Sequence, residues 1–181
     1  MTMDLDLQKI GWKFFFKKNV PVPSTKDSFT IFNTWIANSP EVFIDVSDYS
    51  HVPEGPVTLL SGYYADVVID RTDDQLGFLY QQKIPLSGTT PEKLEKTLKL
   101  ALAAATRFEN EPILKGTAAI DRTRLHFLIN DRAIAPNQAG TFSRYQNDLA
   151  SCLTRVFGQN PKLTHLSEPR KRFRVLSEWN R

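Results

Sequence analysis

The sequence predicts a single α+β domain in which about three helices cover one face of a mostly antiparallel sheet. The chain has 181 residues, a length typical of one domain. Its hydrophobic pattern switches between periods of about 2 and about 3.6, the signatures of strand and helix. Pairs of neighbouring strands outnumber the helices, which are too few to cover both faces of a parallel sheet. We therefore expect residues 1–181 to form one domain.

The N-terminal segment predicts a strand followed by a short helix. Residues 10–18 are aromatic and flanked by lysines, which favours a strand, and Pro21 and Pro23 end it. Residues 28–38 carry apolar side chains at helical spacing. Asp27 precedes them and is a suitable N-cap.

The next segment predicts three strands. Residues 42–47 are β-rich, and 57–69 has the pattern of one long strand with Gly62 as a bulge. Residues 70–75 form a polar turn, and 76–84 returns as the partner strand of a hairpin.

Two longer helices are predicted in the second half of the chain. Residues 91–109 have a leucine-rich face, and Thr90 is the expected N-cap. Residues 141–157 carry an apolar stripe and are followed by Gly158, a favourable residue just beyond a helix end.

The remaining segments predict four more strands. Residues 116–121 and 124–130 suggest a hairpin around a turn at 122–123, and 162–166 and 172–177 suggest two final strands.

A four-residue sequence, Ile-Asp-Arg-Thr, occurs at 69–72 and again at 120–123. Each copy falls where a turn is predicted, and Asp and Thr favour turns because their side chains hydrogen-bond the nearby backbone. Shared turn chemistry explains the echo, and a duplicated half-domain is the alternative.

The cysteine content and the apolar runs of the sequence bear on the cellular compartment. Cys152 is the one cysteine, so neither an intramolecular disulfide nor a thiolate metal cluster can form. Scarce cysteine favours the cytoplasm. The N-terminus lacks a signal-peptide pattern, and no stretch approaches the roughly 20 apolar residues of a membrane span.

Charge is distributed unevenly along the chain. Residues 41–74 carry eight acids and one arginine, a net charge of −7, whereas residues 162–181 carry six bases and two acids, a net charge of +4. The acidic block and the basic tail could attract each other within the chain or between copies, which leaves a homodimer open. The other interpretation is a solvated surface.

The loop at 48–56 is the first candidate site. Asp48, His51 and Glu54 lie in it at intervals of three residues. Two carboxylates and an imidazole could hold a divalent metal, although such a site usually needs a second histidine. The alternatives are a loop that binds a ligand or partner, or a turn stabilised by Asp48 with no function of its own.

The loop at 130–137 is the second candidate site. Asn130, Asp131, Arg132 and Asn137 give it many hydrogen-bonding groups. Arg132 could bind a carboxylate or phosphate through two parallel hydrogen bonds. The alternative is a turn in which Asn130 and Asp131 cap the backbone and Arg132 forms a salt bridge.

The basic segment at 170–174 is the third candidate. Strand alternation places Phe173 and Val175 inward and Arg172 and Arg174 outward. Bases mixed with an aromatic residue could follow a nucleic-acid backbone, but basic side chains also protect the edges of sheets. A net charge of only +3 does not favour nucleic-acid binding.

Motifs for the common nucleotide-dependent, serine-hydrolase and zinc-protease chemistries are absent from the sequence. No cofactor is identified. The sequence therefore favours a binding role over an enzyme.

Several short runs of the sequence carry a resemblance to a known family. They are 35–36 (WI), 44–52 (IDVSDYSHV) with 55–56 (GP), 77–80 (GFLY) before Lys83, and 129–132 (INDR) before 135–137 (APN). In these runs the chain resembles a family of uncharacterised bacterial proteins that occurs in cyanobacteria and proteobacteria. The resemblance spans most of the chain and implies a bacterial source, and it carries no known activity, ligand or catalytic residue.

Three functional hypotheses follow from the sequence. The first is a non-catalytic accessory protein that binds a partner protein or small ligand through the 48–56 and 130–137 loops. The second is a metal-assisted enzyme that uses Asp48, His51 and Glu54. The third is nucleic-acid binding through residues 170–174.

Overall fold

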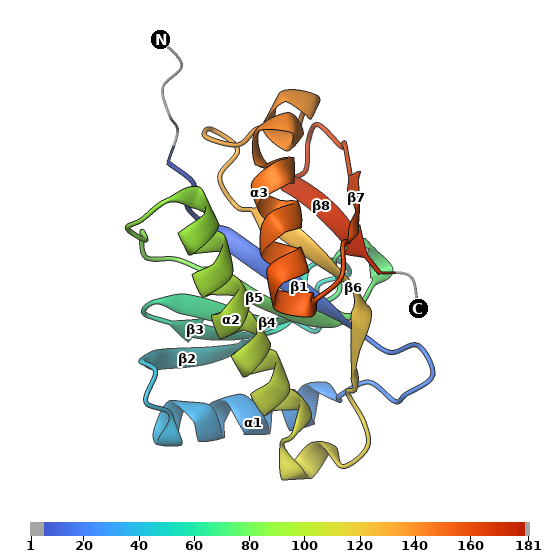
Figure 1. The fold of residues 1–181 in the computed structure, drawn as a ribbon. Helices are drawn as coiled ribbons and strands as arrows, with labels where there is room; N and C mark the ends of the chain where they lie inside the picture. The colour runs from blue at the N-terminus through green and yellow to red at the C-terminus, as the bar shows by residue number, and fades with distance from the viewer. Residues whose placement is uncertain (1–5, 180–181) are drawn as a thin grey trace.

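The computed structural model describes residues 6–179, which form an eight-stranded sheet with three α-helices (Figure 1). All paired strands are antiparallel, so the predicted α+β class is confirmed. In chain order the elements are β1 (Ile10–Phe16), α1 (Thr25–Asn38), β2 (Phe43–Asp48), β3 (Pro56–Gly62), β4 (Ala65–Asp70), the 3-10 turn η1 (Thr72–Asp74), β5 (Gly77–Gln82), α2 (Thr90–Glu109), the 3-10 turn η2 (Pro112–Leu114), β6 (Ile120–Ile129), α3 (Ala139–Phe157), β7 (Lys162–His165) and β8 (Phe173–Glu178).

The first strand lies inside the sheet, whose strand order is β2-β3-β4-β5-β1-β6-β8-β7. All seven residues of β1 are buried. Trp12, Phe14 and Phe16 belong to the main hydrophobic core, whereas Lys13 and Phe15 alternate with them and point to the other face. A strand of aromatic residues is suited to this position, because the position is covered on both faces of the sheet.

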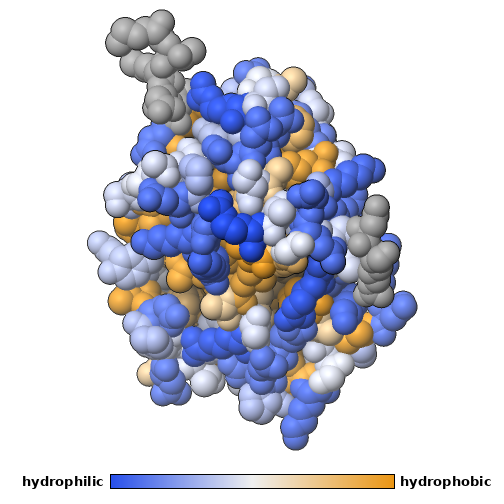
Figure 2. All heavy atoms as spheres, viewed as in Figure 1, coloured by the Kyte–Doolittle hydropathy of each residue, from blue (hydrophilic) through white to orange (hydrophobic). Residues whose placement is uncertain are grey.

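The three helices cover the face of the sheet to which Trp12 points. Helix α2 packs on β1 and β5, α1 on β2 and β3, and α3 on α2 and β7, and Figure 1 shows α2 and α3 crossing in front of the sheet. Seen from this side, the surface is mostly hydrophilic with scattered apolar patches (Figure 2), since the apolar stripes face inward. Within residues 6–179, no helix is long and apolar enough to cross a membrane.

Two predicted N-caps are wrong, by three residues in α1 and by one residue in α2, and one predicted helix end is confirmed. The N-cap of α1 is Ser24, whose hydroxyl accepts the backbone N–H of Asp27. The N-cap of α2 is Thr89, because a capping box joins it to Glu92. Gly158 ends α3 in the left-handed conformation, as predicted.

The predicted long strand at 57–69 is divided into β3 and β4 by a turn at 63–64. A Cβ at position 62 would lie 2.3 Å from the carbonyl oxygen of Ala65. The chain can turn back this tightly because Gly62 has no side chain. The Asp66 carboxylate accepts the Gly62 N–H at 3.1 Å across this turn. Gly62 therefore lies at a chain reversal, and the irregular register beside it falls in β2, between Phe43 and Asp45.

The predicted hairpin around 122–123 is instead continuous strand β6. The Asp121 carboxylate accepts both the N–H (2.9 Å) and the hydroxyl (2.6 Å) of Thr123, where the pairing with β1 is irregular between Phe14 and Phe16. Asp70 accepts the same two groups from Thr72. The repeated Ile-Asp-Arg-Thr sequence therefore shares local hydrogen bonding, which ends a strand at one copy and kinks it at the other.

Glycine at position 77 is required by close strand pairing, which gives a test of the fold. A Cβ there would lie 2.4 Å from the Phe14 carbonyl oxygen, and this backbone atom of the central strand cannot rotate away. We expect Gly77→Ala to lower the free energy of unfolding by about 1–3 kcal/mol, measured by urea denaturation.

Gly140→Ala is the matched control for Gly77→Ala, because a Cβ at position 140 meets no atom within 4 Å. Position 140 lies in the first turn of α3, where alanine is preferred over glycine by about 1 kcal/mol or less. Equal stability changes in the two variants would contradict the close approach at Gly77.

Candidate functional site

The two predicted loops lie at opposite ends of the sheet. The 130–137 loop follows the end of β6, where Ile129 pairs with Ile10 at the start of β1. The 48–56 loop joins β2 to β3 at the end where β1 finishes. Within residues 6–179 no hydrogen bond or ion pair joins the two loops. The sequence-based idea that both loops form one site directly is therefore not supported.

A connector, residues 166–172 between β7 and β8, is held by the 130–137 loop. Arg132 donates a hydrogen bond to the carbonyl of Arg170 at 3.0 Å. Asn137 is 6% exposed and donates from its amide to two connector carbonyls at 2.9 and 3.0 Å. Its amide oxygen lies 2.7 Å from Nε2 of His165. These two candidate residues therefore anchor the connector.

The other two candidates in this loop have different positions. Asp131 accepts the backbone N–H groups of Ala133 (3.0 Å) and Ile134 (3.2 Å), which fixes the turn. Asn130 is exposed and is held through its backbone N–H, which donates to the Lys9 carbonyl at 2.9 Å. Asp131 thus caps backbone groups, as expected from the alternative interpretation of this loop as a turn.

The 48–56 loop does not gather its three candidate ligands. Asp48 accepts the N–H of Ser50 at 2.8 Å, and hydrogen bonds from the Ser50 hydroxyl and backbone lower the Asp48 pKa. His51 is exposed and stacks with Tyr49 at a ring-centroid distance of 6.4 Å. Glu54 turns toward the connector, where it lies 3.7 Å from Lys171. In the described part of the chain, no group of three or more His, Cys, Asp or Glu could hold a metal ion.

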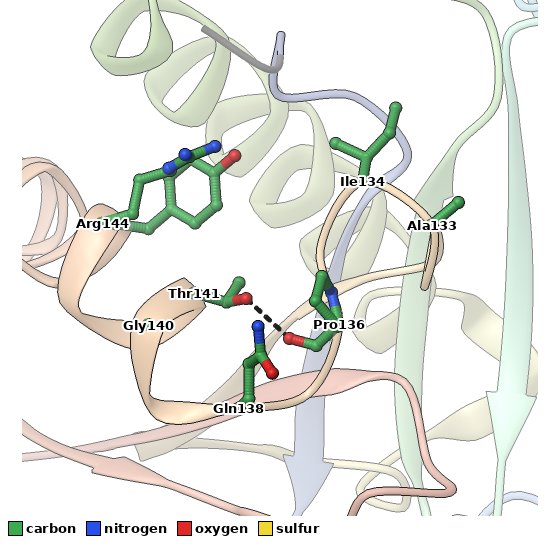
Figure 3. A pocket seen from close by; sticks show the side chains of 8 residues that line it. Ala133, Ile134, Pro136, Gln138, Gly140, Thr141 and Arg144 are labelled. Carbon is green, nitrogen blue, oxygen red and sulfur yellow. Dashed lines mark hydrogen bonds between the residues drawn. The ribbon is translucent and has the colours of Figure 1, made fainter. Parts of the chain in front are cut away.

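A hollow of about 350 Å³, here called the loop pocket, lies between the 130–137 loop and the start of α3 (Figure 3). Arg144 of α3 and Ile134 of the loop stand on opposite sides of it, and the Thr141 hydroxyl donates to the Pro136 carbonyl at 2.6 Å below them. Arg144 is exposed and has no hydrogen bond or ion pair with another of residues 6–179. The residues that line the loop pocket are Ala133, Ile134, Pro136, Gln138, Gly140, Thr141, Arg144 and Tyr145.

The helix-free face of the sheet carries a buried ion pair. Lys13 Nζ lies 2.7 Å from Asp70 Oδ2, and both side chains are 3% exposed or less. Burial lowers the pKa of Lys13, and the charge of Asp70 acts against that change. Such a pair is strongly destabilised when one partner alone is removed, because the other charge stays buried.

A second layer of charges covers this ion pair. Arg174 is 2% exposed and pairs with Asp73 and with Glu168, the latter at 2.6 Å. Lys171 contacts Asp73 at 2.5 Å and Glu168 at 3.2 Å. The predicted attraction between the acidic block and the basic tail therefore occurs within the chain.

These contacts correct the interpretation of the basic segment. Arg174 does point away from the core, as alternation predicted, but it is buried and not exposed, because η1 and the connector lie over that face. The charge of Lys171 is also engaged by acids. Only Arg170 in this segment is exposed. The segment therefore does not present a continuous basic surface to a nucleic acid.

Little in the sequence predicts this buried charge layer. Its members are far apart in the chain, and pairing across the sheet brings them together. One available signal was Lys13 between Trp12 and Phe14, since a lysine inside an aromatic strand needs a partner. That position predicts a buried carboxylate near it without identifying Asp70.

Comparisons of the chain with protein-family models, with curated proteins and with solved structures found no match. The resemblance to the bacterial family, the bacterial source, the cytoplasmic location and the homodimer stay predictions. Function is therefore argued from the geometry of the described residues.

The buried imidazole of His126 makes stability depend on pH. His126 is 5% exposed, and its ring meets the edge of Phe15 at a centroid distance of 4.7 Å. Burial, helped by the charges of Lys13 and Arg174, lowers its pKa from 6.5 to about 3. The unfolded chain therefore takes up a proton below about pH 6.5 that the folded protein refuses, and stability falls as the pH falls from about 6.5 toward about 3.

We expect His126 to contribute about 2 kcal/mol to the loss of unfolding free energy between pH 7 and pH 5. Urea denaturation at both pH values should show a smaller loss in His126→Gln than in the wild type, by that amount. His51→Gln, at an exposed histidine, is the control and should keep the wild-type loss. An unchanged loss in His126→Gln would show that His126 becomes protonated without unfolding.

Proposed function

We propose that this protein is a non-catalytic accessory protein that binds a small organic anion in the loop pocket. The observation that carries the proposal is Arg144, which stands over the pocket with no acidic partner among the described residues. A guanidinium in this situation is available for bidentate hydrogen bonds to a carboxylate or related oxyanion.

The two walls of the pocket differ in chemistry, which suggests the shape of the ligand. The loop side presents Ala133, Ile134 and Pro136, and the helix side presents Gln138 and Arg144. A ligand with an apolar body and one acidic group matches both walls. The start of a helix also favours negative charge, which adds to the effect of Arg144.

The residues singled out in the sequence support this pocket from behind. Asp131 fixes the turn before Ile134, and Asn137 ties the loop to the connector. A loop held in this way loses little further conformational freedom on binding. In the proposal, these residues position the pocket and do not contact the ligand.

The chemistry of the lining favours binding over catalysis. The described lining contains no Asp, Glu, His, Cys or Lys, the side chains that most often act as general bases or nucleophiles. No observation among residues 6–179 favours the metal-assisted alternative, and the paired charges around Arg174 leave the nucleic-acid alternative without support.

We expect Arg144→Gln to weaken the binding of small organic acids about tenfold or more, because it removes a charged hydrogen-bond donor. Benzoate and hexanoate are suitable probes. Their titration should shift the methyl NMR signals of Ile134, which lines the pocket. Native mass spectrometry of the protein from its own host tests for a retained acid.

Arg155→Gln is the matched control for Arg144→Gln. Arg155 lies in the same helix, is exposed, and is not a lining residue of the loop pocket. Equal affinities in the two variants, or no shift at Ile134 with any acid, would contradict the proposal. Capture of a protein partner that depends on Arg144, with no acid bound, would move the function to protein recognition.

A further inference from the structure

A second hollow, here called the charged cleft, lies on the helix-free face of the sheet and differs from the loop pocket. It encloses about 280 Å³ and is bounded by the 48–56 loop, η1 and the start of β8. The buried pair of Lys13 and Asp70 lies nearby, since Lys13 also donates to the carbonyl of Thr72 at 3.2 Å. Its lining residues are Glu54, Gly55, Thr72, Lys171, Arg172 and Arg174.

Most of the charged side chains that line the cleft or lie beside it form close ion pairs. Lys13 pairs with Asp70, and Lys171 and Arg174 both pair with Asp73 and Glu168. Two side chains differ from this pattern. Glu54 has a longer contact, at 3.7 Å from Lys171, and Arg172 has no ion pair with another of residues 6–179.

Arg172 lines the cleft and has no hydrogen bond or ion pair to its side chain from residues 6–179. It is partly buried. Burial lowers the pKa of its guanidinium, and the nearby charge of Asp70 acts against that change without pairing directly. A buried charge without a partner is costly, and a guanidinium offers five donors that an oxyanion could accept.

A second arginine in the lining also lacks an acceptor. Nε of Arg174 is buried and has no hydrogen-bond partner in the described part of the chain, although the two terminal nitrogens are paired. Unsatisfied buried donors are uncommon in folded proteins. Two neighbouring arginines thus have unsatisfied hydrogen-bond donors, which indicates that this face could accommodate one more acceptor group.

Glu54 is the acidic residue of the same cleft that makes the weakest contacts. Its side chain is 58% exposed and lies 3.7 Å from Lys171, which has a closer partner in Asp73 at 2.5 Å. Among residues 6–179, the one hydrogen bond to the Glu54 carboxylate comes from the backbone N–H of Asp73 at 3.3 Å. This carboxylate therefore has free capacity to accept from a cation inside the cleft.

We propose that the charged cleft binds a small zwitterion, an α-amino acid, with its carboxylate on Arg172 and its ammonium group on Glu54. Such a ligand supplies an acceptor to Arg172 and a donor to Glu54, and it adds no net charge to this face. A dianion such as phosphate would face Glu54 across the cleft and is disfavoured by it. The volume of about 280 Å³ admits a compact molecule.

L-Alanine and its two half-molecules provide the test. Propionate lacks the amine, and ethylamine lacks the carboxylate. NMR titration that follows the Nε–H signal of Arg172, assigned by its loss in Arg172→Lys, should show saturable binding of L-alanine. Propionate and ethylamine should bind about tenfold or more weakly, because each loses one charged contact.

Two variants and one control tie the binding to the cleft. Arg172→Gln and Glu54→Gln should each weaken L-alanine binding about tenfold or more. Arg170→Gln, at an exposed arginine of the same connector, should leave it unchanged. Arg172→Gln should also keep or raise the melting temperature, because no ion pair is lost, so weak binding would not reflect unfolding.

Three results would overturn the proposal. Equal affinities for L-alanine and propionate would reduce the cleft to a simple carboxylate site. Tighter binding of inorganic phosphate than of L-alanine would assign it to oxyanions. No response of the Arg172 signal to glycine, L-alanine, L-serine or the other common amino acids would remove the zwitterion altogether. None of these results bears on Ile134 and Arg144, so the loop pocket is tested separately.

Discussion

The ion pair between Lys13 and Asp70 is the constraint on which the helix-free face depends. Strand β1 is the fifth in an eight-stranded sheet and is buried on both sides. Its aromatic residues fill the core under the helices, so its alternate residues must be covered from the other side. Lys13 is covered only because Asp70 meets it at 2.7 Å and η1 supplies a carbonyl. Removing either charge would leave the other one buried and unpaired.

The same constraint explains the connector and its charges. A sheet face that holds a buried lysine cannot be closed by an apolar helix. It is closed by a turn and a loop whose own charges pair, through Asp73, Glu168, Lys171 and Arg174. The 130–137 loop, which leaves the sheet beside the start of β8, then fixes the connector through Asn137. The stability of this face and the shape of both hollows are therefore linked.

The candidate residues show how far local chemistry carries a prediction of function. Asp48 and Asp131 were recognisable as turn residues, because a short carboxylate next to its own backbone behaves alike in most proteins. Arg132 and Asn137 were recognised as hydrogen-bonding residues, but their partners lie 28 or more positions away in the chain. Arg144 was not singled out, since an arginine on a helix has no distinctive local pattern. Arg144 becomes a candidate only in the folded protein, where the 130–137 loop lies opposite it across the loop pocket.

The sequence by itself determined the α+β class, the three helices, the end of α3 at Gly158 and the existence of an aromatic first strand, because these follow from periodicity and short-range backbone chemistry. It did not determine that 57–69 folds back on itself or that β6 continues through Asp121, since each outcome depends on which strand lies alongside. Only the tertiary structure decided which charges meet. Strand order brings Lys13 to Asp70 and Lys171 to Asp73, and it leaves Arg172 without a hydrogen bond or ion pair to its side chain from residues 6–179. Long-range pairing of this kind has no local signature, because its energy comes from contacts between residues distant in the chain.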